Sequence, residues 1–226
     1  MGAFGGPDII TDGLVFAVDA GSTRSYAGSG TTAYNLVANN DVSLINGLGW
    51  QSGNGGYFSS DGTDDGMTTP DATNLDLVDF TLEGWVWWDQ HKNYGSFLVK
   101  GPGGSGNFFN YSFFGYATTV SFGFGDGTNY RNVSISAPAT GEWHHIVGTY
   151  DGSTSRAYIN GVQVWYASTS GNVGGTTYNI GIYNNRTNDG LHNFEGSIPT
   201  AKIYNLALSA QEVQQNFNAY KNRFNI

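Results

Sequence analysis

The sequence predicts an all-β fold, a two-sheet antiparallel sandwich that ends in one short helix. Short apolar segments with period-2 alternation recur along the chain and are separated by turn residues, which is typical of antiparallel strands. The chain has 34 Gly and 15% aromatic residues in 226 positions, a composition that suits many turns and strands. A chain of this length buries about 70% of the surface of its unfolded state, so a single large β domain can account for it.

The expected elements divide the chain into three parts. Residues 1–12 form a Gly-rich arm, residues 13–208 form the β domain, and residues 209–226 form a C-terminal capping helix. A Gly- and Asn-rich stretch over residues 20–56 predicts loops and short edge strands. The clearer strands are expected at residues 14–18, 80–88, 96–100, 107–114, 120–124, 131–136, 144–150, 155–159, 162–166, 178–183 and 198–204.

The hairpin over residues 155–166 is the best-defined local prediction. Asn160-Gly161 separates its strands, and this dipeptide favours a two-residue turn in which both residues have positive φ. Regular pairing from this turn puts Ile159 opposite Val162 and Arg156 opposite Trp165. One face of the hairpin would then carry Arg156, Tyr158, Gln163 and Trp165, and the other Ala157, Ile159, Val162 and Val164.

The C-terminal helix is predicted from its cap and its apolar period. Ser209 with Glu212 three residues later makes a capping box, and Leu208 can pack on Val213. The apolar positions then recur at helical spacing. They are Val213, Phe217, Tyr220 and Phe224. We expect this face to cover the sandwich of the same chain.

Composition excludes several classes of partner. Nine basic residues against 18 acidic ones give a net charge of −9, which repels nucleic acid and anionic membranes. The absence of cysteine excludes a disulfide framework and thiolate chemistry. No apolar run approaches the ~20 residues that span a bilayer, and the N-terminus lacks the basic and apolar regions of a secretory signal.

Three segments resemble laminin G-like, concanavalin A-like jelly-roll domains. They are Phe-Thr-Leu-Glu-Gly-Trp-Val at 80–86, Glu-Trp-His-His-Ile-Val-Gly-Thr-Tyr-Asp-Gly at 142–152 with Tyr-Ile-Asn-Gly-Val at 158–162, and Gly-Ser-Ile at 196–198 with residues 203–213. The resemblance runs from about Leu14 to Phe217 and implies a two-sheet jelly roll. The opening segment, with residues 19–21 and 25–32, is also similar to stand-alone laminin G-like proteins of tailed-phage virions.

The resemblance implies a non-enzymatic surface-contact module, a structural or decorating protein of a bacteriophage virion with the ability to bind glycans. Such a protein is made in the host cytoplasm, is incorporated into the particle and contacts other virion or surface proteins. We expect a homo-oligomer, with the Gly-rich arm ordered by a neighbouring subunit. The alternatives are a carbohydrate-binding lectin-like domain of a bacterial surface or secreted protein, which would be extracellular, and a degenerate glycoside hydrolase.

Hydrolysis is the less favoured alternative because the carboxylates are poorly placed. A retaining glycosidase needs two carboxyl groups ~5–5.5 Å apart, usually on one strand face. The four glutamates each lack a second carboxylate two positions away, and Glu212 belongs to the helix cap. The glutamates are Glu83, Glu142, Glu195 and Glu212. We therefore assign no catalytic residue.

Exposed aromatic residues are the candidates for glycan contact. Arg156, Tyr158 and Trp165 would share the hairpin face, and flat rings on a solvated sheet can stack on sugars. The structural alternative is that these side chains form a cation–π contact that a loop or the second sheet covers. Trp85 and Trp87 share one strand face with Glu83. They too could either contact a glycan or be covered by another part of the fold.

A metal site would fall at the Asp-rich segment 61–66. Asp61, Asp64 and Asp65 surround turning glycines, but the twelfth position of an EF-hand loop is Ala72, which excludes that motif. The family resemblance implies a rim calcium, for which these three residues are candidates with Asp151 as an outsider. The alternative is an Asx-rich turn, and no other cofactor is required. His144 and His145 are adjacent on a strand and point to opposite faces, so we interpret them as structural.

Overall fold

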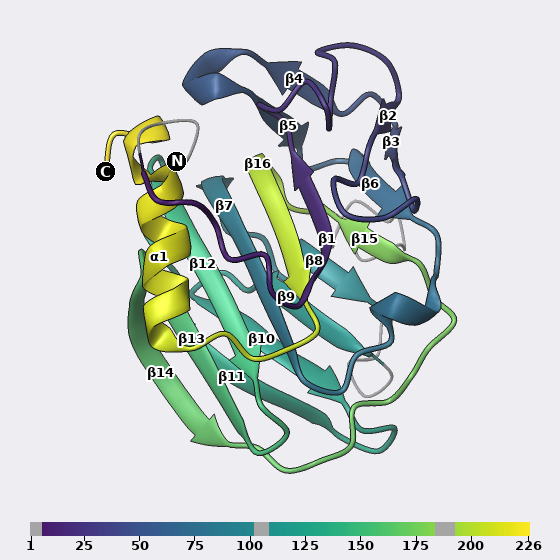
Figure 1. Ribbon diagram of the computed structural model, residues 1–226, viewed down its shortest axis with the longest axis vertical. Coiled ribbons are helices and arrows are strands. Elements are labelled where there is room, and N and C mark those ends of the chain that lie inside the picture. The colour runs from purple at the N-terminus through teal and green to yellow at the C-terminus, as the bar shows by residue number, and fades with distance from the viewer. Residues whose placement is uncertain (1–5, 102–108, 184–192) are drawn as a thin grey trace.

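The computed structural model describes residues 6–101, 109–183 and 193–226, which form two eight-stranded antiparallel sheets (Figure 1). Sheet A has the order β14-β13-β12-β7-β16-β5-β4, with β1 also paired to β16, and sheet B has the order β11-β10-β9-β8-β15-β6-β3-β2. The strands of sheet A are β1 (Leu14–Asp19), β4 (Gly49–Gln51), β5 (Tyr57–Asp61), β7 (Phe80–Gln90), β12 (Trp143–Tyr150), β13 (Thr154–Ile159), β14 (Val162–Ser168) and β16 (Glu195–Tyr204). Those of sheet B are β2 (Thr32–Ala33), β3 (Val42–Ile45), β6 (Gly66–Thr69), β8 (Ser96–Lys100), β9 (Tyr111–Gly115), β10 (Thr119–Gly125), β11 (Tyr130–Ser136) and β15 (Ile180–Ile182).

The main core fills the space between the two sheets. Alternate residues of β7, from Phe80 to Trp88, pack inward, while the residues between them lie on the outer face of sheet A. Two glycines allow rings of sheet B to approach sheet A closely, because a Cβ at Gly84 would strike Phe97 and one at Gly148 would strike Phe122. The predicted all-β antiparallel sandwich is confirmed.

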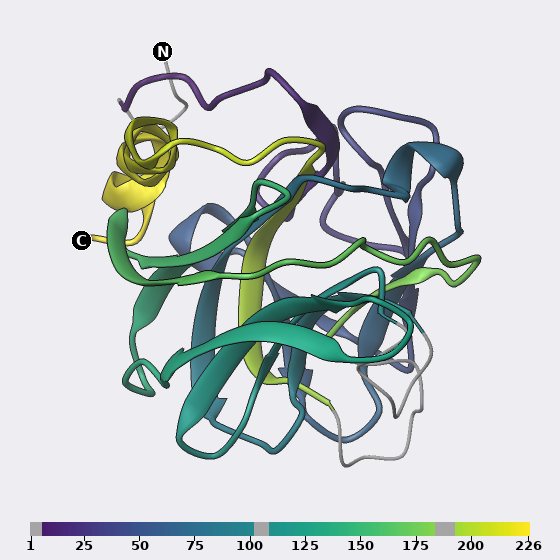
Figure 2. The same cartoon turned by 90° about the horizontal axis from the view of Figure 1, so that it is seen from below.

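The helix α1 (Ala210–Tyr220) covers the outer face of sheet A, so the layers run helix, sheet, sheet (Figure 2). The predicted capping box is present: Ser209 Oγ accepts from the Glu212 N–H, and Glu212 Oε2 accepts from the Ser209 N–H. The apolar face packs on the same chain, as expected. The helix is shorter than residues 209–226, because a 3₁₀ turn, Lys221–Arg223, follows it. Other 3₁₀ turns lie at Gly53–Gly55 and Thr73–Leu75.

The described part of the N-terminal arm packs against the same chain. The backbone N–H of Ile10 donates to Asn216 Oδ1 of α1 over 2.8 Å, and Gln215 Nε2 donates to the carbonyl of Asp8 over 2.8 Å. Ile10 also packs beside the buried Tyr204 and its neighbours. The expectation that this arm needs a neighbouring subunit is therefore wrong for residues 6–12, because α1 supplies the contacts. Residues 1–5 lie outside the described residues.

The Asn160-Gly161 turn is confirmed, since both residues have positive φ, 51° and 77°. The predicted register holds for Ile159 opposite Val162 but is wrong beyond Tyr158, where a β-bulge shifts the pairing. Trp165 lies opposite Ala157, and Tyr166 takes the place opposite Arg156. The alternation of the sequence does not reveal the extra residue in β14.

The other strand predictions agree closely with the structure. The strand expected at 107–114 is β9, which begins at Tyr111, and residues 107–108 lie outside the described residues. The stretch over residues 20–56 does hold the short strands β2, β3 and β4. None of the helices in the described residues has the length and apolar character that crossing a membrane requires.

Candidate functional site

A row of residues across sheet A forms the floor of a hollow beyond the C-terminal end of α1. Trp143 of β12 pairs with Trp87 of β7, Trp87 pairs with Ser197 of β16, and Ser197 pairs with Ser59 of β5. The ring of Tyr57 on β5 packs edge-on against that of Trp143, with 5.5 Å between the ring centroids. The resulting hollow has a volume of about 400 Å³. Its lining residues are Gln51, Asn54, Tyr57, Ser59, Trp87, Asp89, Trp143 and Ser197.

A second hollow lies against the same two tryptophans. It has a volume of about 320 Å³ and adds Glu142, Asn160 and the C-terminal residues Phe224, Asn225 and Ile226. Trp87 and Trp143 line both hollows, with their rings 5.5 Å apart and tilted by 61°. We call the two hollows together the aromatic groove. Each hollow falls within the range of about 300–1,000 Å³ that is typical of small-ligand sites.

The groove is polar and acidic at its rim. The indole Nε1 of Trp87 donates to Asp89 Oδ1 over 3.0 Å, which fixes the orientation of the ring. Glu142 supplies a carboxylate to the second hollow. The residues that line the two hollows include no lysine, arginine or histidine. The groove can therefore stack a flat apolar face and bond hydroxyl or ammonium groups.

The C-terminal wall of the groove is held in place by stacked rings. The ring of Phe224 lies 4.3 Å from that of Trp85 and 4.9 Å from that of Trp143. Arg223, the residue before Phe224, pairs with Asp19 Oδ1 over 2.8 Å and donates to the carbonyls of Asn54 and Gly56. Because these residues follow α1 directly, the position of the wall also depends on how α1 is held on sheet A.

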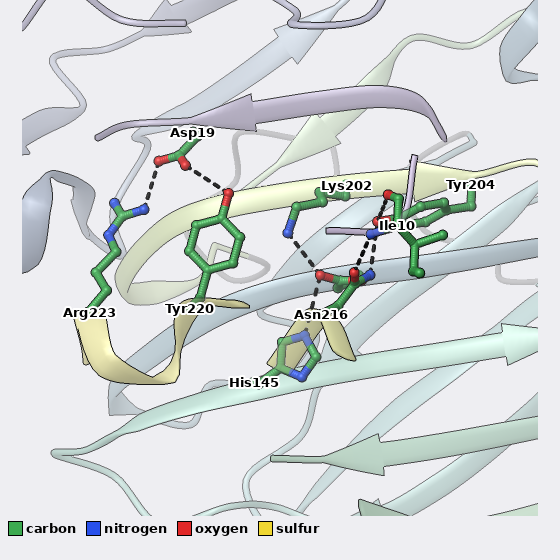
Figure 3. A network of polar contacts seen from close by, with 9 residues as sticks. Ile10, Asp19, His145, Lys202, Tyr204, Asn216, Tyr220 and Arg223 are labelled. Atoms are coloured by element: carbon green, nitrogen blue, oxygen red, sulfur yellow. Dashed lines mark hydrogen bonds and ion pairs between the residues drawn. The ribbon is translucent and has the colours of Figure 1, made fainter. Parts of the chain in front are cut away.

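Beneath α1, a buried polar network fixes the helix to sheet A (Figure 3). Lys202 Nζ lies 2.8 Å from Glu83 Oε1, and His145 Nε2 lies 3.3 Å from the same oxygen. Asn216 Nδ2 donates to Glu83 Oε2 over 2.6 Å and to Tyr204 Oη over 3.0 Å. The Glu83, His145 and Asn216 side chains are fully buried, and Lys202 is nearly so. Buried charges are tolerated where they are paired and hydrogen-bonded in this way.

The pKa values in the network follow from burial and pairing. Burial alone raises the pKa of the Glu83 carboxyl, but the charge of Lys202 and the adjacent His145 outweigh it and hold this pKa at about 2. Burial lowers the pKa of His145 below its ordinary value, although Glu83 opposes the shift. For Lys202, burial works against the attraction of Glu83, and the net pKa is raised. The carboxylate and the ammonium are therefore both charged at neutral pH.

The structure separates most of the aromatic candidates that the sequence indicated. Trp87 lines the groove, but Trp85 is buried under Phe217 and Phe224 and cannot reach a ligand. Tyr158 is buried in the cluster beneath α1. The predicted Arg156, Tyr158 and Trp165 face is wrong, because the bulge in β14 turns Trp165 to the side of Ala157.

Arg156 has a different partner from the one predicted. Its Nη1 lies 2.6 Å from Asp151 Oδ2, and Tyr166 is its cross-strand neighbour. Trp143 and Tyr57 are the aromatic groove residues that sequence reasoning missed. Trp143 precedes the strand expected at 144–150, and its signal was its place in the segment 142–152 that resembles the family.

The Asp-rich segment forms a turn between β5 and β6. Asp61 Oδ1 accepts from the Thr63 N–H over 2.8 Å, and Asp65 Oδ2 accepts from the Asp61 N–H over 3.2 Å. Asp oxygens that accept nearby backbone N–H groups in this way are typical of an Asx-rich turn, the structural alternative to a metal site. In the parts of the chain that the structure describes, no group of three or more His, Cys, Asp or Glu side chains could hold a metal ion. The side chains of Asp61, Asp64 and Asp65 therefore do not form such a group.

The two histidines lie on opposite faces of β12, as predicted. His144 packs near Trp88 on the inner side of sheet A and lies 2.9 Å from the carbonyl of Ala139 through Nε2. His145 packs against Trp85 on the outer side.

The profile of the family described as "Concanavalin A-like lectin/glucanases superfamily" matches residues 61–214. No curated protein matches the chain by sequence. Similar folds occur in solved structures. They include domain 4 of an extracellular arabinanase from Geobacillus stearothermophilus in complex with arabinotriose, with a TM-score of 0.68 and 16% identity over 91% of this chain and 98% of that one.

Two further similar structures belong to longer chains. The binding domain of botulinum neurotoxin serotype D/C has a TM-score of 0.71 and 15% identity, and the match covers 92% of this chain and 52% of that one. Trypanosoma rangeli sialidase has a TM-score of 0.67 and 16% identity, with coverage of 93% and 33%. The chain spans about a third of the sialidase and about half of the toxin domain. At these identities the likeness concerns the fold.

Proposed function

Because the chain belongs to the concanavalin A-like lectin/glucanases superfamily, we propose that it is a non-enzymatic carbohydrate-binding module and that the aromatic groove is its binding surface. The observation that carries this proposal is the pair of hollows that share Trp87 and Trp143. Aromatic rings offer large, rigid apolar faces to sugar rings, and nearby amide and hydroxyl groups bond sugar hydroxyls.

The chemistry of the groove favours a neutral glycan or an amino sugar. Asp89 and Glu142 give the rim two carboxylates, and the whole chain carries a net charge of −9. A sialic acid, a uronate or a sulfated sugar would meet this charge without a basic partner in the groove. The two hollows suit an oligosaccharide that places one ring on each side of the tryptophans.

A non-enzymatic role is supported by the positions of the glutamates. Glu83 is buried beneath α1, Glu195 pairs with Lys92 over 2.8 Å, and Glu212 caps the helix. Within the groove, Asp89 and Glu142 line different hollows. The carboxylate pair of a glycosidase must instead flank one scissile bond.

The proposal is tested with a panel of neutral, amino-sugar and acidic oligosaccharides, followed by titration calorimetry of any that bind. We expect Trp87→Ala to weaken the binding of a neutral or amino-sugar oligosaccharide at least tenfold. Tyr34→Ala, at an aromatic residue exposed outside the groove, is the matched control and should bind as the wild type does. Binding of acidic glycans alone, or full binding by Trp87→Ala, would contradict the proposal.

A second assay addresses catalysis. Incubation with β-glucans, alginate and agar should release no reducing ends. Release that Asp89→Asn or Glu142→Gln abolishes would make the groove an active site.

We also propose that the module is a structural or decorating protein of a tailed-phage particle. The proposal rests on the likeness of its opening segment to laminin G-like virion proteins. Neighbouring genes for capsid or tail proteins, and copurification of the chain with intact particles, would support it. A gene set for a bacterial surface or secreted protein would favour the extracellular lectin-like alternative.

A further inference from the structure

The first hollow of the aromatic groove concentrates negative electrostatic potential. Its three rings lie in different planes, because those of Trp87 and Trp143 are tilted by 61° and those of Tyr57 and Trp143 by 66°. The face of an aromatic ring is the negative part of its quadrupole, and Asp89 adds a full negative charge to the same lining. None of the lining residues is basic. A cationic group is therefore the one that this hollow suits best.

The Asp89 carboxylate is held in place and can still accept a ligand. Its Oδ1 accepts from the indole Nε1 of Trp87 over 3.0 Å, which fixes the carboxylate beside the ring. In the part of the chain that the structure describes, the other oxygen, Oδ2, accepts no hydrogen bond and pairs with no cation. A carboxylate has roughly four acceptor sites, so one bond to the indole leaves most of them open. Asp89 can thus bind a cation without releasing Trp87.

The other polar groups of the first hollow favour an ammonium that carries N–H donors. Two hydroxyl groups and two side-chain amides line the hollow, and each offers an acceptor oxygen. They belong to Ser59, Ser197, Gln51 and Asn54. A primary ammonium has three donors to share among such oxygens and Asp89, whereas a fully methylated one has none. The lining therefore fits a free amino group in its charged form.

The second hollow is better suited to an uncharged sugar ring. Its carboxylate belongs to Glu142, whose side chain is 61% exposed. Water and salt screen the charge of such an exposed group, so it attracts a cation only weakly. The rings of Trp87, Trp143 and Phe224 provide the apolar part of the lining. The two hollows thus differ in the kind of sugar that each accommodates.

From this difference we propose that the ligand of the groove is an oligosaccharide with free amino groups, a glucosamine oligomer. The inference rests on the proposed glycan-binding function and adds the substituent that the first hollow selects. The ammonium donates to Asp89 and lies against the rings of the first hollow, while the next sugar ring occupies the second. A hydroxyl or an acetamide in place of the ammonium carries no charge. Both lose the charge-assisted hydrogen bond, which is about twice as strong as a neutral one.

Titration calorimetry with three trisaccharides of one backbone linkage tests the inference. They are the trimers of glucosamine, N-acetylglucosamine and glucose, which differ in the substituent on one ring carbon. We expect the wild type to bind the glucosamine trimer at least tenfold more tightly than either of the others, and salt to reduce this preference. Asp89→Asn keeps an acceptor for the Trp87 indole but removes the charge, so it should abolish the preference.

Asp79→Asn is the matched control. Asp79 is exposed and precedes the first residue of β7, at the opposite end of this strand from Asp89, so the variant loses the same charge outside the groove. It should keep the preference for the glucosamine trimer. Melting temperatures show that both variants fold.

Two results would overturn the inference. One is equal binding of the three trimers by the wild type, and the other is a preference that Asp89→Asn retains in full. If the trimers bind equally and Trp87→Ala weakens all of them, the groove is a glycan site without selection for the amino group. In that case the proposed function stands and this inference alone fails.

Discussion

Asn216 of α1 and Glu83 of β7 are joined by a 2.6 Å hydrogen bond that is fully buried. The same Asn216 side chain accepts the backbone N–H of Ile10. One amide therefore ties the C-terminal helix, the central sheet and the N-terminal segment together. The predictions below follow from this network, from the groove and from the hairpin.

Removal of the Glu83 charge should destabilise the fold severely. Glu83→Gln leaves the Lys202 ammonium buried without its counter-charge, and breaking a buried pair costs about 3–5 kcal/mol. Urea denaturation should show this loss in the free energy of unfolding. Glu142→Gln, whose native side chain is 61% exposed, should change it little. Equal stabilities for the two variants would mean that the Lys202 charge is compensated elsewhere.

Stability should fall as the pH is lowered, in two stages. The pKa of His145 is lowered in the folded state, so the unfolded chain takes up its proton first, from about pH 6.5 downward. The Glu83 carboxyl has a folded pKa of about 2. Its contribution is complete above the unfolded value of about 4.3 and is lost as the pH falls toward the folded value. Denaturation curves from pH 7 to pH 2 should show both losses. Glu83→Gln should reduce the second loss without abolishing it, because the carboxyl of Asp151 also has a folded pKa of about 2.

The turn of the β13-β14 hairpin should tolerate no β-branched residue. Gly161 has φ +77°, and the side chain of Gln214 above it is flexible, so backbone strain is the main cost of Gly161→Val. Left-handed backbone costs an L-residue about 1–2 kcal/mol. Gly175→Val is the control, because a Cβ there meets no atom and its φ is not in the left-handed region. Equal melting temperatures would contradict the turn geometry.

Asp89 should act in the groove through the orientation of Trp87. Asp89→Ala removes the acceptor of the indole N–H and should weaken glycan binding several-fold, since such a bond is worth about 1 kcal/mol. Asp89→Asn keeps an acceptor oxygen without the charge. Full binding by Asp89→Asn indicates a neutral ligand, whereas a loss equal to that of Asp89→Ala indicates an amino sugar. Calorimetric titration separates these results, and unchanged binding by Asp89→Ala would exclude the orienting role.

Truncation of residues 1–12 should weaken the fold. The deletion removes the hydrogen bonds of Ile10 and Asp8 to α1 and the apolar contact of Ile10. A partly buried isoleucine contributes about 1–2 kcal/mol. Differential scanning calorimetry should show the lower melting temperature, with Ile10→Ala giving part of the effect. A truncated chain that keeps its melting temperature but forms a smaller oligomer than the full chain would return the assembly role to the arm.

The strands and the helix could be predicted because their signals are local. Period-2 alternation identified β7, and the Ser209–Glu212 spacing identified the start of α1. The aromatic groove could not be predicted, because Trp143, Trp87 and Ser197 align only through the strand order β12-β7-β16. That order depends on pairings between distant segments.

The remaining errors also have physical causes. The bulge in β14 adds a residue without breaking the pattern of apolar residues. Trp165 therefore lies opposite Ala157, one position from the predicted Arg156. Glu83 and Lys202 are charged residues within strongly apolar strands, a pattern that indicates a buried ion pair. Their meeting still required that β7 and β16 be neighbours.

The contact between Ile10 and Asn216 spans 206 positions of the chain, and that between Asp19 and Arg223 spans 204. β1 likewise pairs with β16, although β16 is synthesised long after β1. During synthesis, β1 leaves the ribosome long before its partners exist. Contacts of such long range are slow to form, and unpaired strands aggregate easily. The nascent chain is therefore most exposed to aggregation before β16 and α1 have emerged, and its outer layer closes only after Asn216 and Arg223 are available.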